Sequence, residues 1–292
     1  MEAVTVQLDD YTPDVVLPVD KEFAIPYSRA VEAGAEIAAR SRVVFCGMAR
    51  QIGEMLPVTI ARLEEIGSRF SAWSAVVVEN DSTDSTKDVL RDWQRRSDGR
   101  VLADCRDLGR EHLHGFENAR VERYAEYRNR YLDLARLTYG DADFVVAVDL
   151  DAWGGYSSDG VMHSVYELSR NDQAGCMAST SLYRARTDSG ELTWAHYDIW
   201  ALRMYGAGVR FERWQPLWLP PPGAPPIPVV SAFGALATYR AEAFFDSRYR
   251  SLHGDIEHVG FHLDMAGQGW GVYLNPASRV VMHWLHGLIE GV

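Results

Sequence analysis

Two aspartates, Asp149 and Asp151, stand at the end of an apolar run, DFVVAVDLD. Side chains two residues apart in a strand point to the same side, so these carboxylates can share one ligand. Paired carboxylates with open positions suit Mg²⁺ or Mn²⁺, which in turn hold diphosphate oxygens. Asp-x-Asp is a common tripeptide, and the alternative is a solvated turn in which Asp151 caps a helix. The apolar run before the pair favours a metal site at a strand end.

A second group of polar residues follows another apolar run, in VVVENDSTDST. Glu79 comes directly after the apolar residues, where a carboxylate can accept hydrogen bonds from a nucleobase or a ribose. Asp81, Ser82 and Asp84 also suit the start of a helix, because their side chains accept backbone N–H groups. Capping explains some of these residues and leaves Glu79 as a candidate ligand.

Arg128 lies 21 residues before Asp149, in a segment rich in arginine. Its guanidinium can neutralise a diphosphate or pair with Asp149. The alternative is an ordinary surface residue, and spacing alone favours that alternative.

The last group comprises Asp255, Glu257 and His258, with His283 and His286 beyond them. A carboxylate at the start of a helix can act as a base on an acceptor hydroxyl. A neutral imidazole can complete a metal site begun by two carboxylates. His283 lies in the apolar run RVVMHW and is equally well explained as a structural histidine, so the choice between His283 and His286 as a ligand stays open.

These groups require strands and helices that alternate through the first half of the chain. Apolar runs predict buried strands over 42–47, 74–80, 100–105 and 143–151, with helical spacing between them and a long helix over 118–138. The alternation predicts an α/β fold with a mostly parallel central sheet flanked by helices. Ligands bind at the carboxyl ends of such strands, where 47–50, 79–82 and 149–151 fall.

The second half of the chain is rich in aromatic residues and proline. Seven aromatic residues lie between 194 and 218, and WLPPPGAPPIP follows them. Aromatic faces stack on sugar rings, which suits an acceptor site, although many of these rings can simply form core. The proline segment predicts a loop that serves as a rim or a lid. Later segments predict a strand or strand pair in VVSAFGALATYR, a helix in DIEHVGFHLDMAG, and two short strands in GVYL and RVVMHW.

The composition of the 292 residues is ordinary for a globular protein, with a formal net charge of −12. This acidity argues against nucleic acid and against anionic membranes as partners. Three cysteines without a CxxC pair exclude a thiolate zinc site and fit a reducing compartment. The sequence shows no signal peptide and no membrane-spanning segment, so we expect a cytoplasmic protein.

Together these motifs resemble those of GT-A glycosyltransferases. VVVENDSTDST is similar to the VVDDGSTDGT-type run of family 2 glycosyltransferases, Arg128-Asn129 to their Ala-Arg-Asn segment, and Asp149-Leu150-Asp151 to their metal-binding Asp-x-Asp. The set FCGMAR, VENDSTDST and ERYAEYRNRYL resembles the CAP59-type (capsule-associated) mannosyltransferases more closely. The resemblance covers roughly residues 42–285 and depends on the ordered set rather than on one motif.

The resemblance implies a single GT-A catalytic domain over 42–292, with a nucleotide-binding half at 42–151 and an acceptor-binding half at 152–292. Residues 1–41 would be an N-terminal extension packed on it. The cofactor would be Mn²⁺ or Mg²⁺, and the donor a nucleoside-diphosphate sugar such as GDP-mannose or a UDP-hexose. The acceptor would be a hydroxyl of a carbohydrate or glycoconjugate.

The resemblance also assigns roles to residues. Glu79 would contact the nucleoside, with Gly47, Asp81 and Trp153 also near the donor. Arg50 and Arg128 would lie near the diphosphate. Asp149 would face the ribose and the metal, Asp151 would ligate the metal, and His283 would add a further ligand. The late helix carries Glu257-His258 where those enzymes often have Glu-Asp. The missing second acid and the CAP59-type resemblance favour retention, although Glu257 or Asp255 remains a candidate base.

Three other functions remain open. A sugar-phosphate nucleotidyltransferase would need a glycine-rich phosphate loop, and CGMARQIGE at that position has none. A nucleotide-sugar hydrolase could use Asp255 and Glu257 without an acceptor. A catalytically inactive carbohydrate-binding protein on a GT-A scaffold is the third, and the Asp149/Asp151 pair argues against it.

Overall fold

The computed structural model of the protein describes residues 12–113, 117–186, 191–206, 217–252 and 254–282. Helices and strands alternate up to the strand that carries the aspartate pair, as the sequence predicts. The elements in chain order are α1 (Pro13–Val16), α2 (Ala24–Ala38), β1 (Arg42–Ala49), α3 (Leu56–Ser68), β2 (Ala72–Asn80), α4 (Thr86–Arg96), β3 (Val101–Arg106), α5 (Asn118–Tyr139), β4 (Phe144–Asp149), β5 (Gly155–Tyr156), α6 (Ser158–Arg170), β6 (Ala174–Arg186), β7 (Leu192–His196), β8 (Ile227–Val229), β9 (Leu236–Arg240), α7 (Ala241–Asp246), α8 (Glu257–Gly267) and β10 (Gly271–Val281).

The described strands form one sheet in the order β3-β2-β1-β4-β9-β6-β10-β5, with β7 paired to β6 and β8 to β10. The first four strands are parallel, because helices on the faces of the sheet connect them. Strand β9 then enters antiparallel to both β4 and β6. The predicted α/β fold is confirmed, with a parallel first half and a mixed second half.

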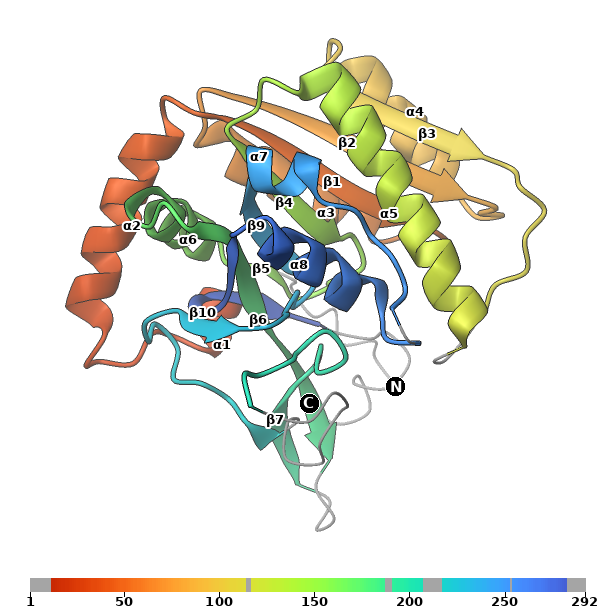
Figure 1. Cartoon of the computed structure of the whole chain (residues 1–292). Helices are drawn as coiled ribbons and strands as arrows, with labels where there is room; N and C mark the ends of the chain where they lie inside the picture. The colour runs from red at the N-terminus through yellow and green to blue at the C-terminus, as the bar shows by residue number, and fades with distance from the viewer. Residues whose placement is uncertain (1–11, 114–116, 187–190, 207–216, 253, 283–292) are drawn as a thin grey trace, which may run out of the picture.

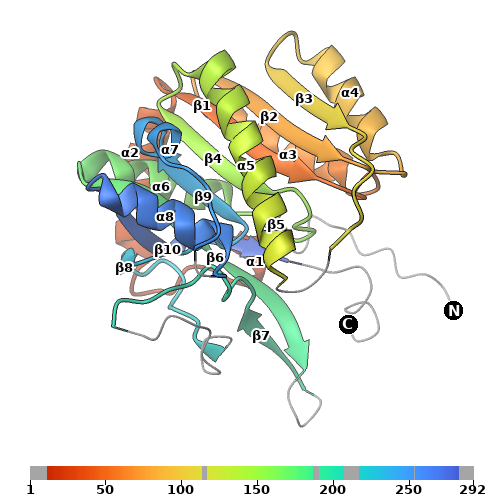
Figure 2. The ribbon, with the colours of Figure 1, turned by 45° about the vertical axis from the view of Figure 1, so that its right-hand side comes forward.

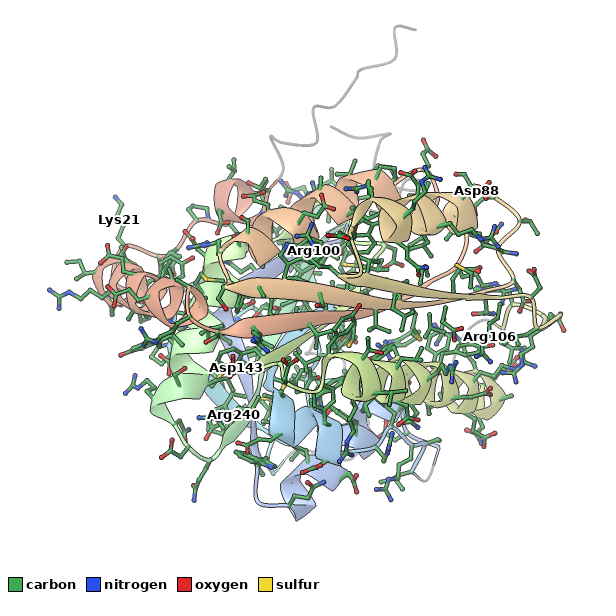
Figure 3. All side chains as sticks on the ribbon, turned by 90° about the horizontal axis from the view of Figure 1, so that it is seen from above. Lys21, Asp88, Arg100, Arg106, Asp143 and Arg240 are labelled. Atoms are coloured by element: carbon green, nitrogen blue, oxygen red, sulfur yellow. The ribbon has the colours of Figure 1, made fainter. Side chains whose placement is uncertain are left out.

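Helices cover both faces of this sheet. The core on one face joins α2, α3, α4 and α6 to the strands, and the core on the other face joins α5, α7 and α8 to them. Figure 3 shows the strands between these two layers of helices. Side chains of a strand alternate between the faces, so Val145 packs in the second core and its neighbour Val146 in the first.

The register of the parallel strands brings the predicted site residues to one edge of the sheet. Asp149 at the end of β4 pairs with Met48 of β1, and Ala49 of β1 pairs with Glu79 of β2. These three strand ends therefore lie side by side. The residues of β4 before Asp149 are buried on both faces, as expected for a central parallel strand.

Residues before β1 are tied to the main sheet. Helix α2 packs so closely on α6 that a Cβ on Gly34 would lie 1.9 Å from the carbonyl oxygen of Met162. Arg279 of β10, which is 2% exposed, donates from Nη2 to Asp14 Oδ1 at 2.6 Å. In the second half, β6 runs past the sheet and projects with β7 from the body of the molecule (Figures 1 and 2).

One predicted boundary is wrong at the end of the chain. The two short closing strands that the sequence suggests form a single strand, β10. Its pairing with β6 shifts register between Asn275 and Arg279, so an irregularity inside the strand replaces the expected break. Nowhere in the described residues is a helix long and apolar enough to cross a bilayer.

Candidate active site

The aspartate pair sits where the central strand ends. Asp149 is the last residue of β4, and Asp151 follows in the turn after it. Two hydrogen bonds fix this turn: Asp149 N donates to the backbone oxygen of Ala235 at 2.8 Å, and the side-chain hydroxyl of Tyr156 donates to Asp149 O at 2.6 Å. Leu150 between them is buried. The Asp149 side chain is 31% exposed, so it is accessible to a ligand.

Arg128 of α5 lies against this pair rather than at the surface. It is 3% exposed, and its Nη2 approaches Asp149 Oδ1 at 3.4 Å while its Nε donates to Glu257 Oε1 at 2.9 Å. The rings of Phe233 and Tyr249 lie 5.1 and 5.8 Å from its guanidinium carbon. The interpretation of Arg128 as a surface residue, which spacing alone favours, is therefore wrong.

Opposite charges keep Arg128 ionised. Burial works against its charge, but the surrounding Tyr131, Glu257 and Asp149 hold the pKa of Arg128 well above its usual value. The site therefore contains a permanent cation at the junction of α5, β4 and α8.

The two aspartates carry more negative charge than Arg128 alone balances. Burial raises the pKa of Asp149, and the neighbouring Arg128 opposes that rise. Burial and the nearby charge of Asp149 raise the pKa of Asp151 to about 7. A second cation between these carboxylates would relieve their repulsion.

The donor set fits a divalent cation that also binds a diphosphate. Asp149 and Asp151 supply carboxylate oxygens, which Mg²⁺ and Mn²⁺ prefer. Within the described ranges no three acidic, histidine or cysteine side chains come together as a complete metal site. Mg²⁺ at phosphate-transfer sites is commonly bound by one or two carboxylates together with phosphates and water, so two protein ligands suffice. His283, the predicted third ligand, and His286 lie outside the described residues.

The predicted base candidates are both paired with arginines. Glu257 begins α8 and is held by Arg128, as described above. Asp255 receives Nε and Nη2 of Arg203 at 3.2 and 2.5 Å, and the two side chains are 14% and 10% exposed. Arg203 was not predicted to take part, because its partner lies 52 residues away along the chain.

His258 is brought to the same site by α8. Its ring stacks on Phe233 with a centroid separation of 3.9 Å. Burial and the charge of Arg128 hold its pKa well below the usual value, so the imidazole is neutral. Neither ring nitrogen has a hydrogen-bond partner among the described residues.

Glu79 and Asp81 lie at the end of β2 and differ in their surroundings. Glu79 is fully buried; its Oε1 accepts the N–H of Ser82 at 2.8 Å, and its Oε2 has no partner among the described residues. Asp81 accepts the N–H groups of Leu108 and Gly109 at 2.6 and 2.7 Å. Although slight burial opposes them, these donors lower the pKa of Asp81. Asp81 therefore organises the loop after β3.

A cavity of about 340 Å³ opens beside the end of β2, which is within the size range of ligand sites. Its walls include Glu79, Asn80, Arg106 and Tyr127. Asn80 and Tyr127 were not predicted as site residues. Asn80 stands next to the predicted Glu79, and its amide can both donate and accept hydrogen bonds.

The remaining predicted donor residues, Gly47, Arg50 and Trp153, contact neighbouring segments of the chain. Gly47 of β1 lies so close to β4 that an added Cβ would meet Leu150 at 3.0 Å. Arg50 donates from Nη2 to Arg110 O at 3.1 Å. The carbonyl of Trp153 accepts Nη1 of Arg62 at 2.7 Å.

A further carboxylate, Asp198, reaches the site from the segment after β7. Its Oδ2 accepts the N–H of Gly234 at 2.9 Å, next to the residue that holds Asp149 N. Burial raises the pKa of Asp198 to about 6. The sequence offers no motif around it beyond the aromatic residues of WAHYDIW, so sequence reasoning missed it.

The aromatic residues of the second half have mixed environments. Trp194 of β7 lies under the guanidinium of Arg184 at 4.5 Å. Trp200 and Tyr205 are 37% and 66% exposed. Phe211 and Trp214 lie outside the described residues.

No protein-family model matches the chain, and no curated protein matches its sequence. Solved structures do match it. A mannosyltransferase of Pyrobaculum calidifontis, solved with GDP-Man and Mn²⁺, aligns over 91% of this chain and 69% of its own with 14% identity and a TM-score of 0.50. GalNAc-T7, solved with UDP, GalNAc and Mn²⁺, aligns over 93% of this chain with 12% identity and a TM-score of 0.52.

The chain spans about half of the GalNAc-T7 chain, 54% of its length. At these identities the likeness concerns the fold. The fold of this chain that aligns with them is the one described above, a central sheet flanked by helices on both faces. The chain has the GT-A fold of nucleotide-sugar glycosyltransferases.

Proposed function

We propose that the protein is a metal-dependent glycosyltransferase that moves a hexose from a nucleoside-diphosphate sugar to a hydroxyl of a glycan or glycoconjugate. One observation carries this proposal: Asp149 and Asp151 stand at the end of the central parallel strand with the buried Arg128 against them. The GT-A fold supports it, and so do the ligands of the matched structures, GDP-Man with Mn²⁺ in one and UDP with Mn²⁺ in the other.

In this proposal Asp149 and Asp151 hold Mn²⁺ or Mg²⁺ together with the diphosphate. The bound ion would act as a Lewis acid that neutralises charge on the departing nucleoside diphosphate. Arg128 fixes the orientation of Asp149 and adds positive charge at the same place. Glu257 keeps Arg128 in position from the other side.

The cavity at the end of β2 is our candidate for the nucleoside. Glu79 and Asn80 would supply hydrogen bonds to the base or ribose, and Tyr127 also lines the cavity. We assign residues 42–151 to donor binding and residues 152–292 to acceptor binding. The exposed rings of Trp200 and Tyr205 then suit a carbohydrate acceptor. GDP-mannose is the donor that we favour, and a UDP-hexose is the second candidate.

The stereochemical outcome depends on the fate of the acceptor proton. If the departing diphosphate accepts it, the enzyme retains the anomeric configuration, as the resemblance to CAP59-type enzymes favours. A carboxylate free to act as a base would give inversion instead. Asp255 and Glu257 each already accept an N–H of arginine, so at least one oxygen of each carboxylate is occupied.

A thermal-shift screen tests donor binding. UDP, GDP, CDP and dTDP are each added with Mn²⁺ and with EDTA. A ligand that binds only the folded protein stabilises it and so raises the melting temperature. At a ligand concentration of a hundred times the Kd, the stabilisation is about 2.7 kcal/mol. We expect a shift with one diphosphate, only with Mn²⁺, that identifies the base of the donor.

Asp151→Asn is the test variant for this screen, and Asp159→Asn its control. Asp159 pairs with Arg69, and its side chain is 48% exposed. We expect Asp151→Asn to lose the metal-dependent shift and Asp159→Asn to keep it. The absence of a shift with every diphosphate would favour a carbohydrate-binding protein. A hydrolase would be favoured if the protein binds a nucleotide and releases free sugar, but transfers no sugar to added glycans.

A further inference from the structure

Asp198 is a carboxylate of the site that no arginine, lysine or histidine pairs with among the described residues. Glu257 is held by Arg128 at 2.9 Å, and Asp255 by Arg203 at 2.5 Å. An N–H group of arginine therefore already occupies at least one oxygen of each of these carboxylates. In the part of the chain that the structure describes, each oxygen of Asp198 accepts one hydrogen bond, a backbone N–H from Gly234 at 2.9 Å and from Ala201 at 3.3 Å. A lone pair stays free on each oxygen.

The backbone places Asp198 close to the aspartate pair. Gly234 N donates to Asp198 Oδ2, and the carbonyl of the next residue, Ala235, accepts Asp149 N at 2.8 Å. This turn opens β9, which lies directly beside β4 in the sheet. Adjacent residues of one turn therefore bind the carboxylate of Asp198 and the backbone of Asp149. Among the described residues, Asp198 does not form a group of three metal-ligating side chains with Asp149 and Asp151.

The turn that holds Asp198 is rigid. Gly234 and Ala235 both have positive φ, at 66° and 61°. A Cβ on Gly234 would lie 1.8 Å from the carbonyl oxygen of Ser179, so the close approach requires glycine. Ser181 fixes the other side, since its Oγ accepts Asp198 N at 3.1 Å. The carboxylate is therefore held in one place before a substrate binds.

We propose that Asp198 is the general base that accepts the proton of the attacking hydroxyl. The inference rests on the proposed function. As the acceptor oxygen bonds to the anomeric carbon, its proton passes to Asp198. The bond from that carbon to the diphosphate oxygen breaks, and its electron pair leaves with the nucleoside diphosphate. Attack and departure occur on opposite faces of the sugar, so the product has the inverted configuration, in contrast to the retention that the CAP59-type resemblance favours.

The charge around Asp198 suits this role. Burial raises its pKa to about 6; the N–H of Gly234 opposes that rise, and the negative charges of Asp149 on β4 and Glu257 on α8 add to it. Tyr197 is the titratable neighbour on its own segment, and burial raises the pKa of that phenol far above its usual value. A carboxylate with a pKa near 6 is ionised at pH 7 to 8 and more basic than an ordinary aspartate.

The test is the release of nucleoside diphosphate from GDP-mannose and UDP-hexoses, with water as the acceptor. We expect Asp198→Asn to lower kcat by a factor of about 10² to 10⁴, the usual contribution of a general base. The Kd for the nucleoside diphosphate should stay within about twofold of the wild-type value, because Asp198 acts on the acceptor. Asp159→Asn, at a surface ion pair, is the matched control and should keep wild-type rates.

Azide separates a base from a merely structural carboxylate. Azide attacks without a proton to lose, so it should restore nucleotide release in Asp198→Ala and yield an inverted glycosyl azide. Release by Asp198→Asn within about threefold of wild type, or no effect of azide, would overturn the inference and leave the proposed function intact. Absence of release by the wild-type protein from every donor would overturn the proposed function, and this inference with it.

A third variant guards against loss of the fold. If neither the Asn nor the Ala variant shows a cooperative melting transition, Asp198→Glu is measured, which keeps the carboxylate on a longer side chain. If Asp198→Glu releases nucleotide more than about tenfold more slowly than the wild type and binds nucleotide with unchanged affinity, the result supports Asp198 as the general base. Proton transfer depends on the exact position of the carboxylate. An unchanged rate overturns this assignment.

Discussion

Arg128 connects three elements of the site through one side chain. Its guanidinium contacts Asp149 of β4 and Glu257 of α8, and it lies between the rings of Phe233 and Tyr249. Because the group is 3% exposed, each carboxylate around it compensates for lost hydration. The ion pairs of Arg128 therefore affect stability as well as ligand binding.

Glu257→Gln should destabilise the fold. It keeps the shape of the side chain and removes the charge that compensates Arg128. Removing one partner of a buried ion pair lowers the free energy of unfolding by about 3 kcal/mol or more. The partly exposed Asp149 compensates for only part of the lost negative charge. Unfolding by urea, followed by circular dichroism, measures the change. Asp88→Asn, which removes an exposed partner of Arg91, is the control and should shift stability by less than about 0.5 kcal/mol. Equal midpoints for both variants would contradict this account of Arg128.

Three buried histidines should stay neutral well below neutral pH. Burial lowers the pKa of His163 and His196 to about 4 and that of His262 to about 3. Their ring signals in NMR spectra of labelled protein should not titrate between pH 7.5 and 5.5. Titration of these signals near pH 6.5 would contradict the buried placement.

The same shifts have a defined sign for stability. A histidine whose folded pKa is lowered contributes fully above pH 6.5, and that contribution is lost as the pH falls towards the folded pKa. Each of these histidines lowers the free energy of unfolding at pH 5 by roughly 2 kcal/mol relative to pH 7.5. Asp151 and Asp198 act oppositely, because their raised pKa values favour the folded protein at low pH. The NMR signals therefore report on the histidines more directly than a melting curve.

Single residues were predictable where a local pattern marks them. Asp149, Asp151 and Glu79 follow apolar runs, and the structure places all three at the carboxyl edge of the sheet. Arg128 was a candidate only through the family resemblance, because nothing in its own segment distinguishes it from four other arginines. Asp198 and Arg203 depend on contacts with residues 36 and 52 positions away, which no local pattern contains.

At the level of elements, the short turn before β9 holds the site together. Phe233 packs on His258 and Arg128, Gly234 binds Asp198, and Ala235 binds the backbone of Asp149. The turn thereby connects α8, α5 and β4 with the segment after β7. Its conformation must be exact, because each of these contacts depends on it.

Gly234→Ala tests this turn, with Gly267→Ala as its control. Gly234 has a φ of 66° and no room for a Cβ, whereas Gly267 ends α8 with nothing within 4 Å. We expect Gly234→Ala to destabilise the protein by ~3 kcal/mol, from left-handed strain and overpacking together. Gly267→Ala should be neutral or stabilise by up to ~1 kcal/mol. Equal effects in urea unfolding would show that the turn does not constrain the fold.

The parallel strands were the predictable part of the fold, because strands buried on both faces give continuous apolar runs. The predicted strands over 42–47, 74–80, 100–105 and 143–151 agree with β1 to β4 within a few residues. The irregular β10 was not predictable as one strand, since Asn275 and Ser278 interrupt its apolar pattern. Both side chains are buried, and Asn275 donates to Ser164 Oγ at 2.9 Å.

At the scale of the whole molecule, one sheet runs from the predicted nucleotide half into the predicted acceptor half. The join is β9, which pairs with β4 on one side and with β6 on the other. Asp149 belongs to the first half, while Asp198 and Glu257 come from the second, so the site forms only where the two halves meet. Long-range strand order of this kind does not follow from local sequence patterns.

The most direct test of the central claim is turnover of a nucleotide sugar. GDP-mannose and UDP-hexoses are incubated with the wild-type protein in Mn²⁺, with the wild-type protein in EDTA, and with Asp151→Asn in Mn²⁺, and nucleoside diphosphate is measured. The account predicts release from one donor by the wild-type protein in Mn²⁺ and a loss of at least a hundredfold, about 2.7 kcal/mol of transition-state stabilisation, under the other two conditions. Release that persists in EDTA and in Asp151→Asn would contradict the assignment of Asp149 and Asp151 to a metal-bound diphosphate.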